Sequence, residues 1–189
     1  MNRGYFHAGS KPDKNDLGGF WKSKNASHII SSKEKFQPGL LSMVVNPMKD
    51  TFQNNYSGIK VYVANTTSSP IKFNASDSRL SMKVQALNAK GEWKDIEYLP
   101  GSSCGNSYHI SSLEPEHFWS FATPKYTGDF KTKLRIALSY ADPNDKSEKH
   151  WQRKELTIYS NEYEGSINPG QFWRKRDYYP TNIMDPYTE

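Results

Sequence analysis

Short stretches in which apolar and polar residues alternate run through the middle of this chain, from about residue 40 to residue 159. In the stretch TKLRIALSY, Leu134, Ile136 and Leu138 fall on one side of an extended backbone. Lys133 and Arg135 fall on the other side. A repeat of two residues is typical of β-strands with one buried and one solvent-facing side, and it indicates antiparallel sheets packed face to face. The pattern therefore predicts an all-β fold, a two-sheet antiparallel β-sandwich.

Size and composition fit a single globular domain with appendages. The chain has 189 residues, of which 35% are hydrophobic, 24% charged and 14% aromatic. The aromatic content argues against a disordered chain, because disordered segments are poor in large rings. The charges behind the net +5 are spread along the whole sequence and define no basic face, so a nucleic-acid partner is not favoured.

Shifts in composition divide the chain into three regions. We predict an extended N-terminal arm over residues 1–36, a β-sandwich over residues 37–165 and an extended aromatic and basic tail over residues 166–189. Prolines in the tail disfavour a regular helix or a central strand there.

About eight strands are expected in the sandwich, separated by turn-forming residues. The first strand is expected to close at Pro47, with a polar connection over residues 47–58, and the last one lies in ELTIYS. The best hairpin is RLSMKVQALNAKGEWKDIEYLP, in which Gly91 suits a positive φ and the second arm suggests a bulge. The stretch GSSCGNSYHISS is expected to be a loop. The predicted core is Leu41, Met43, Ile59, Val61, Val63, Leu80, Met82, Val84, Leu134, Ile136, Leu138, Leu156 and Ile158.

The segment LEPEHFWSFATPKYTGDFKTKLRIALSY, residues 113–140, carries a resemblance to known domains. Its Leu-x-Pro entry, aromatic strand, x-Gly-x-aromatic corner and alternating strand resemble the later strands of immunoglobulin-like and fibronectin III-like domains. The resemblance implies an immunoglobulin-like topology and says little about activity. The chain departs from antibody-type domains, because Cys104 is its single cysteine and the paired cysteines of those domains are missing.

The sharpest cluster with chemical potential is CGNSYH. Cys104 and His109 could form a thiolate–imidazole pair, with Asn106 as the orienting group. Adjacency in sequence is weak evidence for such a pair, and a tight loop with a packed cysteine explains the same residues. The histidines lack metal-ligand spacing, and no pair of carboxylates stands out in a motif that would place two acids across a cleft. The DPNDKSE loop has nearly calcium-like spacing of oxygen ligands but lacks the central Gly and distal Glu of an EF-hand. We therefore expect no enzyme activity, no cofactor and no metal.

Large aromatic residues in the two terminal regions point to binding instead. Trp, Tyr and Arg are the residues that most often anchor protein interfaces. We predict a non-catalytic binding or assembly module, at a cell surface or in a larger complex, whose arms contact another protein chain or a second copy. The expected anchors are Phe20, Trp21, Trp173, Arg174, Arg176, Tyr178 and Tyr179.

Two alternatives remain beside this hypothesis. One is a carbohydrate-binding sandwich in which Trp151 or Trp173 stacks on a sugar ring. The other is the Cys104/His109 thiol enzyme. For location, analogy with similar sandwiches favours an extracytoplasmic protein of the periplasm or cell surface, whereas a native start at Met1 would favour the cytoplasm. No apolar run reaches the roughly 18 residues that a membrane-spanning helix needs.

Overall fold

A computed structural model describes residues 5–11, 18–98, 102–147 and 152–173. The described residues form strands joined by turns, with two short 3-10 helices, η1 (Gly105–Ser107) and η3 (Pro169–Phe172). The strands are β1 (His28–Ile29), β2 (Leu41–Phe52), β3 (Tyr56–Asn65), β4 (Ile71–Ser76), β5 (Arg79–Leu80), β6 (Met82–Leu87), β7 (Trp93–Asp95), β8 (Tyr108–Leu113), β9 (His117–Pro124), β10 (Phe130–Ala141), β11 (Glu155–Tyr159) and β12 (Tyr163–Ile167).

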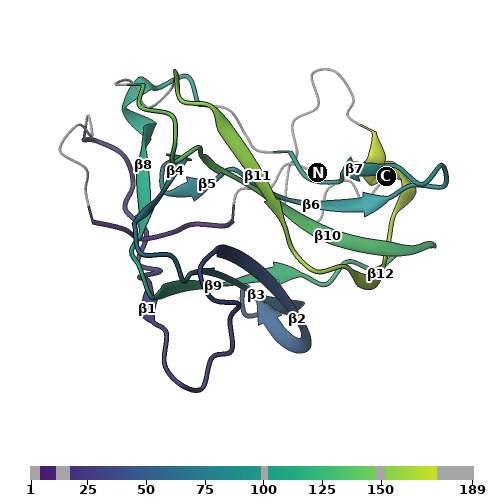
Figure 1. Ribbon diagram of the computed structural model, residues 1–189. Helices are drawn as coiled ribbons and strands as arrows, with labels where there is room; N and C mark the ends of the chain where they lie inside the picture. Colours follow the sequence, from purple (N-terminus) through teal and green to yellow (C-terminus); the bar gives the residue numbers. More distant parts are fainter. Residues whose placement is uncertain (1–4, 12–17, 99–101, 148–151, 174–189) are drawn as a thin grey trace.

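The strands form antiparallel sheets packed together, so the all-β sandwich is confirmed. One layer is the four-stranded sheet β1-β9-β3-β2. Above it in Figure 1 lies the five-stranded sheet, ordered β11-β10-β6-β7 with β12 also paired to β10. The strands β5-β4-β8 pair among themselves as a third, smaller sheet, in which β4 lies next to β10. The second layer of the sandwich is thus divided into two hydrogen-bonded units.

Side chains from facing sheets fill one continuous core. Its largest fully buried members include Trp119, Phe73 and Phe6. The predicted core is buried along β2, β3, β6 and β10. Leu156 and Ile158 are the exceptions, since both are only half-buried. They lie on β11, an edge strand of the five-stranded sheet, where neighbours cover one side only.

Strand β2 continues past the proline that was expected to end it. Its pairing with β3 shifts register between Asn46 and Lys49, so Pro47 and Met48 lie in a bulge. A bulge on an edge strand tolerates proline because no ladder hydrogen bond is required from its nitrogen. The connection predicted over residues 47–58 is therefore wrong; the turn is limited to the residues between Phe52 and Tyr56.

Two tight turns without glycine escaped prediction. Gln53 and Asn54 join β2 to β3, and Asp77 and Ser78 join β4 to β5, all with positive φ. Paired positive φ values are typical of hairpin turns whose twist matches the strands. By contrast, Gly91 in the β6–β7 hairpin has a positive φ, as predicted; its value is 76°. The predicted loop around Cys104 is partly wrong as well, because its second half forms β8.

The described part of the N-terminal region packs on its own sandwich. Phe6 and Ala8 are buried members of the core, and the backbone nitrogen of Ala8 donates to the carbonyl of Ser78 at 2.8 Å. The indole nitrogen of Trp119 donates to the carbonyl of Gly9 at 3.0 Å. This segment therefore completes the core.

At the other end, the predicted boundary between domain and tail falls inside β12. Ile167 is fully buried and pairs with Phe130 of β10. Phe172 packs edge-to-face on Phe130, with 5.8 Å between ring centroids. The sandwich therefore extends at least to η3.

Candidate functional site

The side of the five-stranded sheet that faces away from the core carries an aromatic and charged surface, which we call the outer face. Cross-strand partners in an antiparallel sheet share a side, so the register defines its members. They are Lys83, Gln85 and Leu87 of β6, Trp93 and Asp95 of β7, Lys131, Lys133, Arg135, Ala137, Ser139 and Ala141 of β10, Glu155, Thr157 and Tyr159 of β11, and Glu164 and Ser166 of β12.

At the centre of the outer face, a guanidinium lies between two aromatic rings. The Cζ atom of Arg135 is 3.8 Å from the ring centroid of Tyr159 and 4.3 Å from that of Trp93. A cation within about 6 Å of a ring centroid is attracted by the negative face of the ring. Tyr159 is 49% exposed, so this Trp93–Arg135–Tyr159 stack is accessible from solvent.

A hydrogen-bonded ladder fixes the orientation of the guanidinium. Arg135 Nε donates to Gln85 Oε1 at 2.9 Å, and Gln85 Nε2 donates to Asp95 Oδ1 at 2.8 Å. Asp95 also forms an ion pair with Lys83. The four side chains come from three adjacent strands, and each is oriented by the next.

Most charges on and around the outer face are paired. Lys83 pairs with Asp95, and Lys133 pairs with Glu162 at 3.0 Å. The hydrogen bond to Glu162, followed by its negative charge, raises the pKa of Lys133. Among the described residues, no carboxylate lies within ion-pair distance of Arg135. Within the described part of the chain, the stack therefore presents a positive charge without a carboxylate counterpart.

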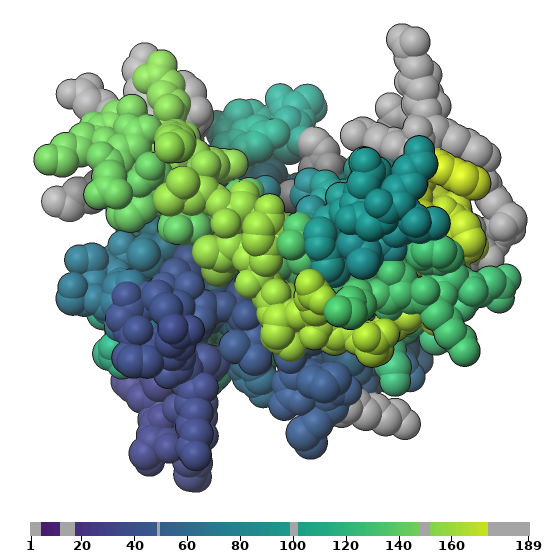
Figure 2. Space-filling model, turned by 45° about the vertical axis from the view of Figure 1, so that its right-hand side comes forward, coloured from purple at the N-terminus to yellow at the C-terminus, as the bar shows by residue number. Residues whose placement is uncertain are grey.

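The space-filling view shows how the strands of this face meet. Teal atoms of the β6–β7 hairpin lie beside yellow-green atoms of β11 and β12 and green atoms of β10 (Figure 2). Segments distant in sequence thus form one continuous surface.

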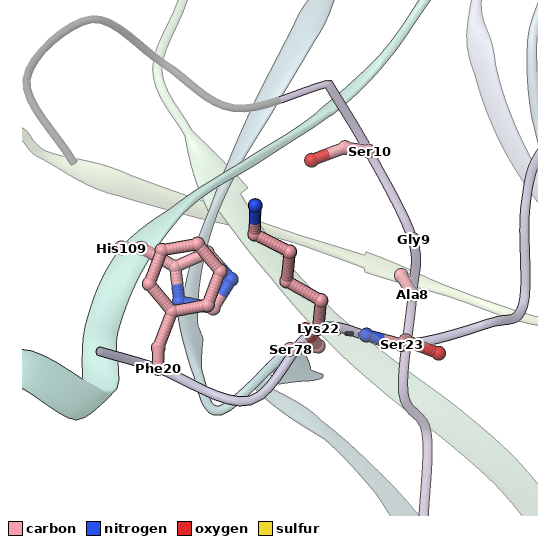
Figure 3. A pocket seen from close by; sticks show the side chains of 8 residues that line it. All are labelled: Ala8, Gly9, Ser10, Phe20, Lys22, Ser23, Ser78 and His109. Carbon is pink, nitrogen blue, oxygen red and sulfur yellow. Dashed lines mark hydrogen bonds between the residues drawn. The ribbon is translucent and has the colours of Figure 1, made fainter. Parts of the chain in front are cut away.

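A second candidate is a small cavity where the N-terminal segments cross β5 and β8. The rings of Phe20 and His109 stack at 3.8 Å between centroids with an interplanar angle of 6°. Lys22 extends between Phe20 and Ser10 (Figure 3). The cavity has a volume of about 20 Å³, which is room for a water molecule and too small for a metabolite.

A third candidate is an open depression of about 360 Å³ beside Tyr5 and Phe52. Two of its polar groups already serve the fold. The side-chain amide of Asn25 donates to the carbonyls of His7 and Ser120, and the hydroxyl of Tyr5 donates to Glu97 at 2.5 Å. These polar groups of the lining already form hydrogen bonds that hold the N-terminal segment, so few polar groups remain to orient a ligand.

A buried carboxylate lies behind that depression. Glu97 is fully buried, and its carboxylate accepts hydrogen bonds from the hydroxyls of Tyr5 and Tyr126 and from the backbone nitrogen of Val84. Burial, and next the charge of Glu97, raises the pKa of Tyr5 and that of Tyr163. Because the group is enclosed by the core, we interpret it as a structural element that ties the N-terminal segment to the sheet.

The structure places the sequence-predicted residues as follows. Phe20 is half-buried against His109, Trp21 is 54% exposed beside the ring of His7, and Trp173 is 74% exposed after η3. Outside the described residues lie Trp151, Arg174, Arg176, Tyr178 and Tyr179.

Cys104 and His109 have different surroundings. The thiol of Cys104 is exposed. His109 is buried, with its ring on Phe20 and its Nδ1 3.2 Å from the carbonyl oxygen of Ser107. The imidazole is thus enclosed by the fold and packed against the N-terminal region.

Sequence reasoning missed the central stack. Arg135 and Tyr159 were visible as members of alternating strands, but no local pattern placed Trp93 beside them. The fact that Trp93 shares a side with Gln85 and Asp95 depends on the hairpin register. The signal that could have placed Trp93 on the solvent-facing side of the sheet is the polar character of its neighbours in the sequence.

Asp145, in the loop after β10, is held by internal hydrogen bonds. Asp145 accepts from the backbone nitrogens of Lys154 and Ser147, at 2.7 and 2.9 Å, and from the hydroxyl of Ser147 at 2.6 Å. These bonds, led by the one from Lys154, lower the pKa of Asp145 from 3.8 to about 2.

We expect Asp145 to titrate near pH 2 in side-chain carboxyl NMR spectra of the folded protein. Since the pKa is lower in the folded than in the unfolded state, the carboxylate stabilises the fold fully above pH 3.8, and this contribution is lost as the pH falls towards 2. An Asp145→Asn variant should lack this part of the acid sensitivity. A midpoint at 3.8 in the wild type would contradict the hydrogen-bonded arrangement.

Two negative findings concern the described residues alone. They contain no group of three or more His, Cys, Asp or Glu side chains placed to hold a metal ion. Nor do they include a helix with the length and apolar character needed to cross a membrane.

Comparison with known proteins adds no relative. The chain matches no protein-family model, no curated protein sequence and no solved structure.

Proposed function

We propose that this protein is a non-catalytic binding module that docks another protein on its outer face. The observation that carries the proposal is the Trp93–Arg135–Tyr159 stack on the exposed side of a sheet. Trp, Tyr and Arg dominate the energy of protein interfaces, and they do so most when they are held rigidly at the centre of the patch. The ladder through Gln85 provides that rigidity.

The strand order supports an immunoglobulin-like version of this proposal. In such domains strands A, B and E share one sheet, and strands C, F and G share the other, with C′ beside C in variable-type domains. Here the orders β2-β3-β9 and β7-β6-β10-β11 follow A-B-E and C′-C-F-G. The outer face then lies on the C′CFG sheet. An extracytoplasmic location is part of the proposal, and cell fractionation tests it.

Site-specific photo-crosslinking tests the proposed interface. A photoreactive phenylalanine analogue at the exposed Thr157 of the outer face should yield a covalent adduct with another protein in cells. The same analogue at Lys60, exposed on β3 of the other sheet, is the matched control. Mass spectrometry of the adduct identifies the partner.

The purified partner then allows a quantitative measurement. Trp93→Ala or Tyr159→Ala should weaken binding about thirtyfold, because truncating an interface anchor costs roughly 2 kcal/mol or more. Adducts at Lys60 alone, or an affinity unchanged by both substitutions, would place the interface elsewhere.

One observation favours a carbohydrate-binding alternative. Trp173 is 74% exposed, and an exposed indole can stack on a sugar ring. Glycan-array binding that is lost in Trp173→Ala and retained in Trp93→Ala would select this alternative. The reverse pattern would assign the ligand to the outer face.

A further inference from the structure

One edge of the Arg135 guanidinium has no hydrogen-bond partner in the part of the chain that the structure describes. Its Nε donates to Gln85, whereas its two Nη groups make no hydrogen bond to any described residue. The two terminal nitrogens of a guanidinium form a planar fork that matches the two oxygens of a carboxylate. The arrangement thus leaves a bidentate donor pair at the centre of the outer face.

Charge on this surface limits what the donor pair can hold. Lys83 and Lys133 have carboxylate partners on Asp95 and Glu162. Lys131 and Glu164, which share this side near β12, add one charge of each sign. Among the described residues, Arg135 therefore leaves about one unit of positive charge unbalanced at the centre of the face. Phosphate-rich ligands such as nucleic acids are held by clusters of cations, whereas a single central cation matches a single negative charge.

The flanking rings favour a ligand with an apolar stem. Trp93 and Tyr159 stand on either side of the guanidinium, so a group that reaches the donor pair also passes the exposed parts of both rings. The side chains of Glu and Asp carry their carboxylate on a short aliphatic stem. Because Gln85 already fixes the guanidinium in the unbound protein, less conformational entropy is lost when a ligand binds.

We infer that the Nη groups of Arg135 bind the carboxylate of an acidic side chain on a partner protein, through two parallel N–H···O hydrogen bonds. The inference rests on the proposed docking function and names its recognition chemistry. Trp93 and Tyr159 contact the stem of the acidic side chain, and Gln85 holds the guanidinium in place through its Nε.

A peptide titration followed by NMR tests the inference on the full chain. The probe is a capped peptide of alternating Gly and Glu, compared with the same peptide carrying Gln instead of Glu. We expect saturable shifts of the Arg135 Nε–H and Trp93 indole N–H signals with the Glu peptide, and at least about tenfold weaker binding of the Gln peptide.

Substitutions separate the donor pair from general charge attraction. Arg135→Gln should abolish the saturable shifts, and Arg135→Lys should weaken binding several-fold although it keeps the charge, because an ammonium cannot form the planar fork. Lys60→Gln makes the same change of net charge on the opposite sheet and should leave the affinity unchanged. Amide spectra of each variant check that it is folded.

Three outcomes would overturn the inference. They are the absence of shifts at Arg135, equal binding of the Glu and Gln peptides, and tighter binding of inorganic phosphate than of the Glu peptide. Failure of the proposed function gives a different result, namely no adduct at Thr157 in the wild type. If that adduct forms equally well in Arg135→Gln, the docking proposal stands and the carboxylate assignment is wrong.

Discussion

Replacing Glu97 with alanine is expected to lower the free energy of unfolding by about 3–5 kcal/mol. The carboxylate is fully buried and accepts from two tyrosine hydroxyls and one backbone nitrogen. Removing it takes this acceptor from the Tyr126 hydroxyl and the Val84 nitrogen, whereas the Tyr5 hydroxyl keeps Thr123 Oγ1 at 2.7 Å. Each unsatisfied buried donor costs about 1–3 kcal/mol, reduced where water can enter. A total of this size is a large part of the roughly 5–15 kcal/mol that stabilises a typical domain.

Urea denaturation of wild type and variant measures this effect. Tyr163→Phe is a suitable control in the same neighbourhood, because the hydroxyl of Tyr163 is buried and makes no hydrogen bond to a described residue. Its removal should leave stability unchanged or slightly raised. A loss below about 1 kcal/mol for Glu97→Ala would show that the carboxylate does not organise this part of the core.

The second large effect is expected for Phe6→Ala, a loss of about 3–5 kcal/mol. Phe6 is only 2% exposed and packs edge-to-face on Phe121, with 5.7 Å between ring centroids. Its carbonyl also accepts from the backbone nitrogen of Leu80 at 3.0 Å. Truncating the ring opens a cavity between the N-terminal segment and the sheet, which the rigid surroundings fill only in part.

Phe20→Ala is the matched comparison for the N-terminal region. Phe20 is half-buried and stacks on His109 at the surface of the smaller sheet, so its truncation should cost about 1 kcal/mol. Thermal and urea unfolding of the two variants decide the role of residues 5–11. Equal costs would mean that the segment is attached to the sandwich without completing its core.

The periodic strands were predictable because the face of the sheet that a side chain occupies follows from its position in the alternating sequence. Leu134, Ile136 and Leu138 alternate with polar residues and are buried. Strand β9 lies where the aromatic strand was expected within residues 113–140, and β4 begins directly after Pro70, a residue that suits a strand start. These features depend on backbone geometry that spans only a few residues.

Other elements escaped prediction because long-range contacts decide them. Strand β8 becomes a strand by pairing with β4, and β12 by pairing with β10. Gly128 shows the same dependence, since a Cβ atom there would lie 2.2 Å from the backbone carbonyl carbon of Ile167. The corner was visible in the sequence, but the requirement for glycine at this position comes from β12 packing against it.

The alternation of apolar and polar residues was sufficient to establish an all-β sandwich, because a period of two has one simple structural solution. The candidate site was decided by register alone. Gln85 of β6 pairs with Asp95 of β7 on one side and with Arg135 of β10 on the other. Tyr159 of β11 pairs with Ala137 of β10. Pairings between residues tens of positions apart follow from how whole strands fit together in the core, and a local pattern does not encode that fit.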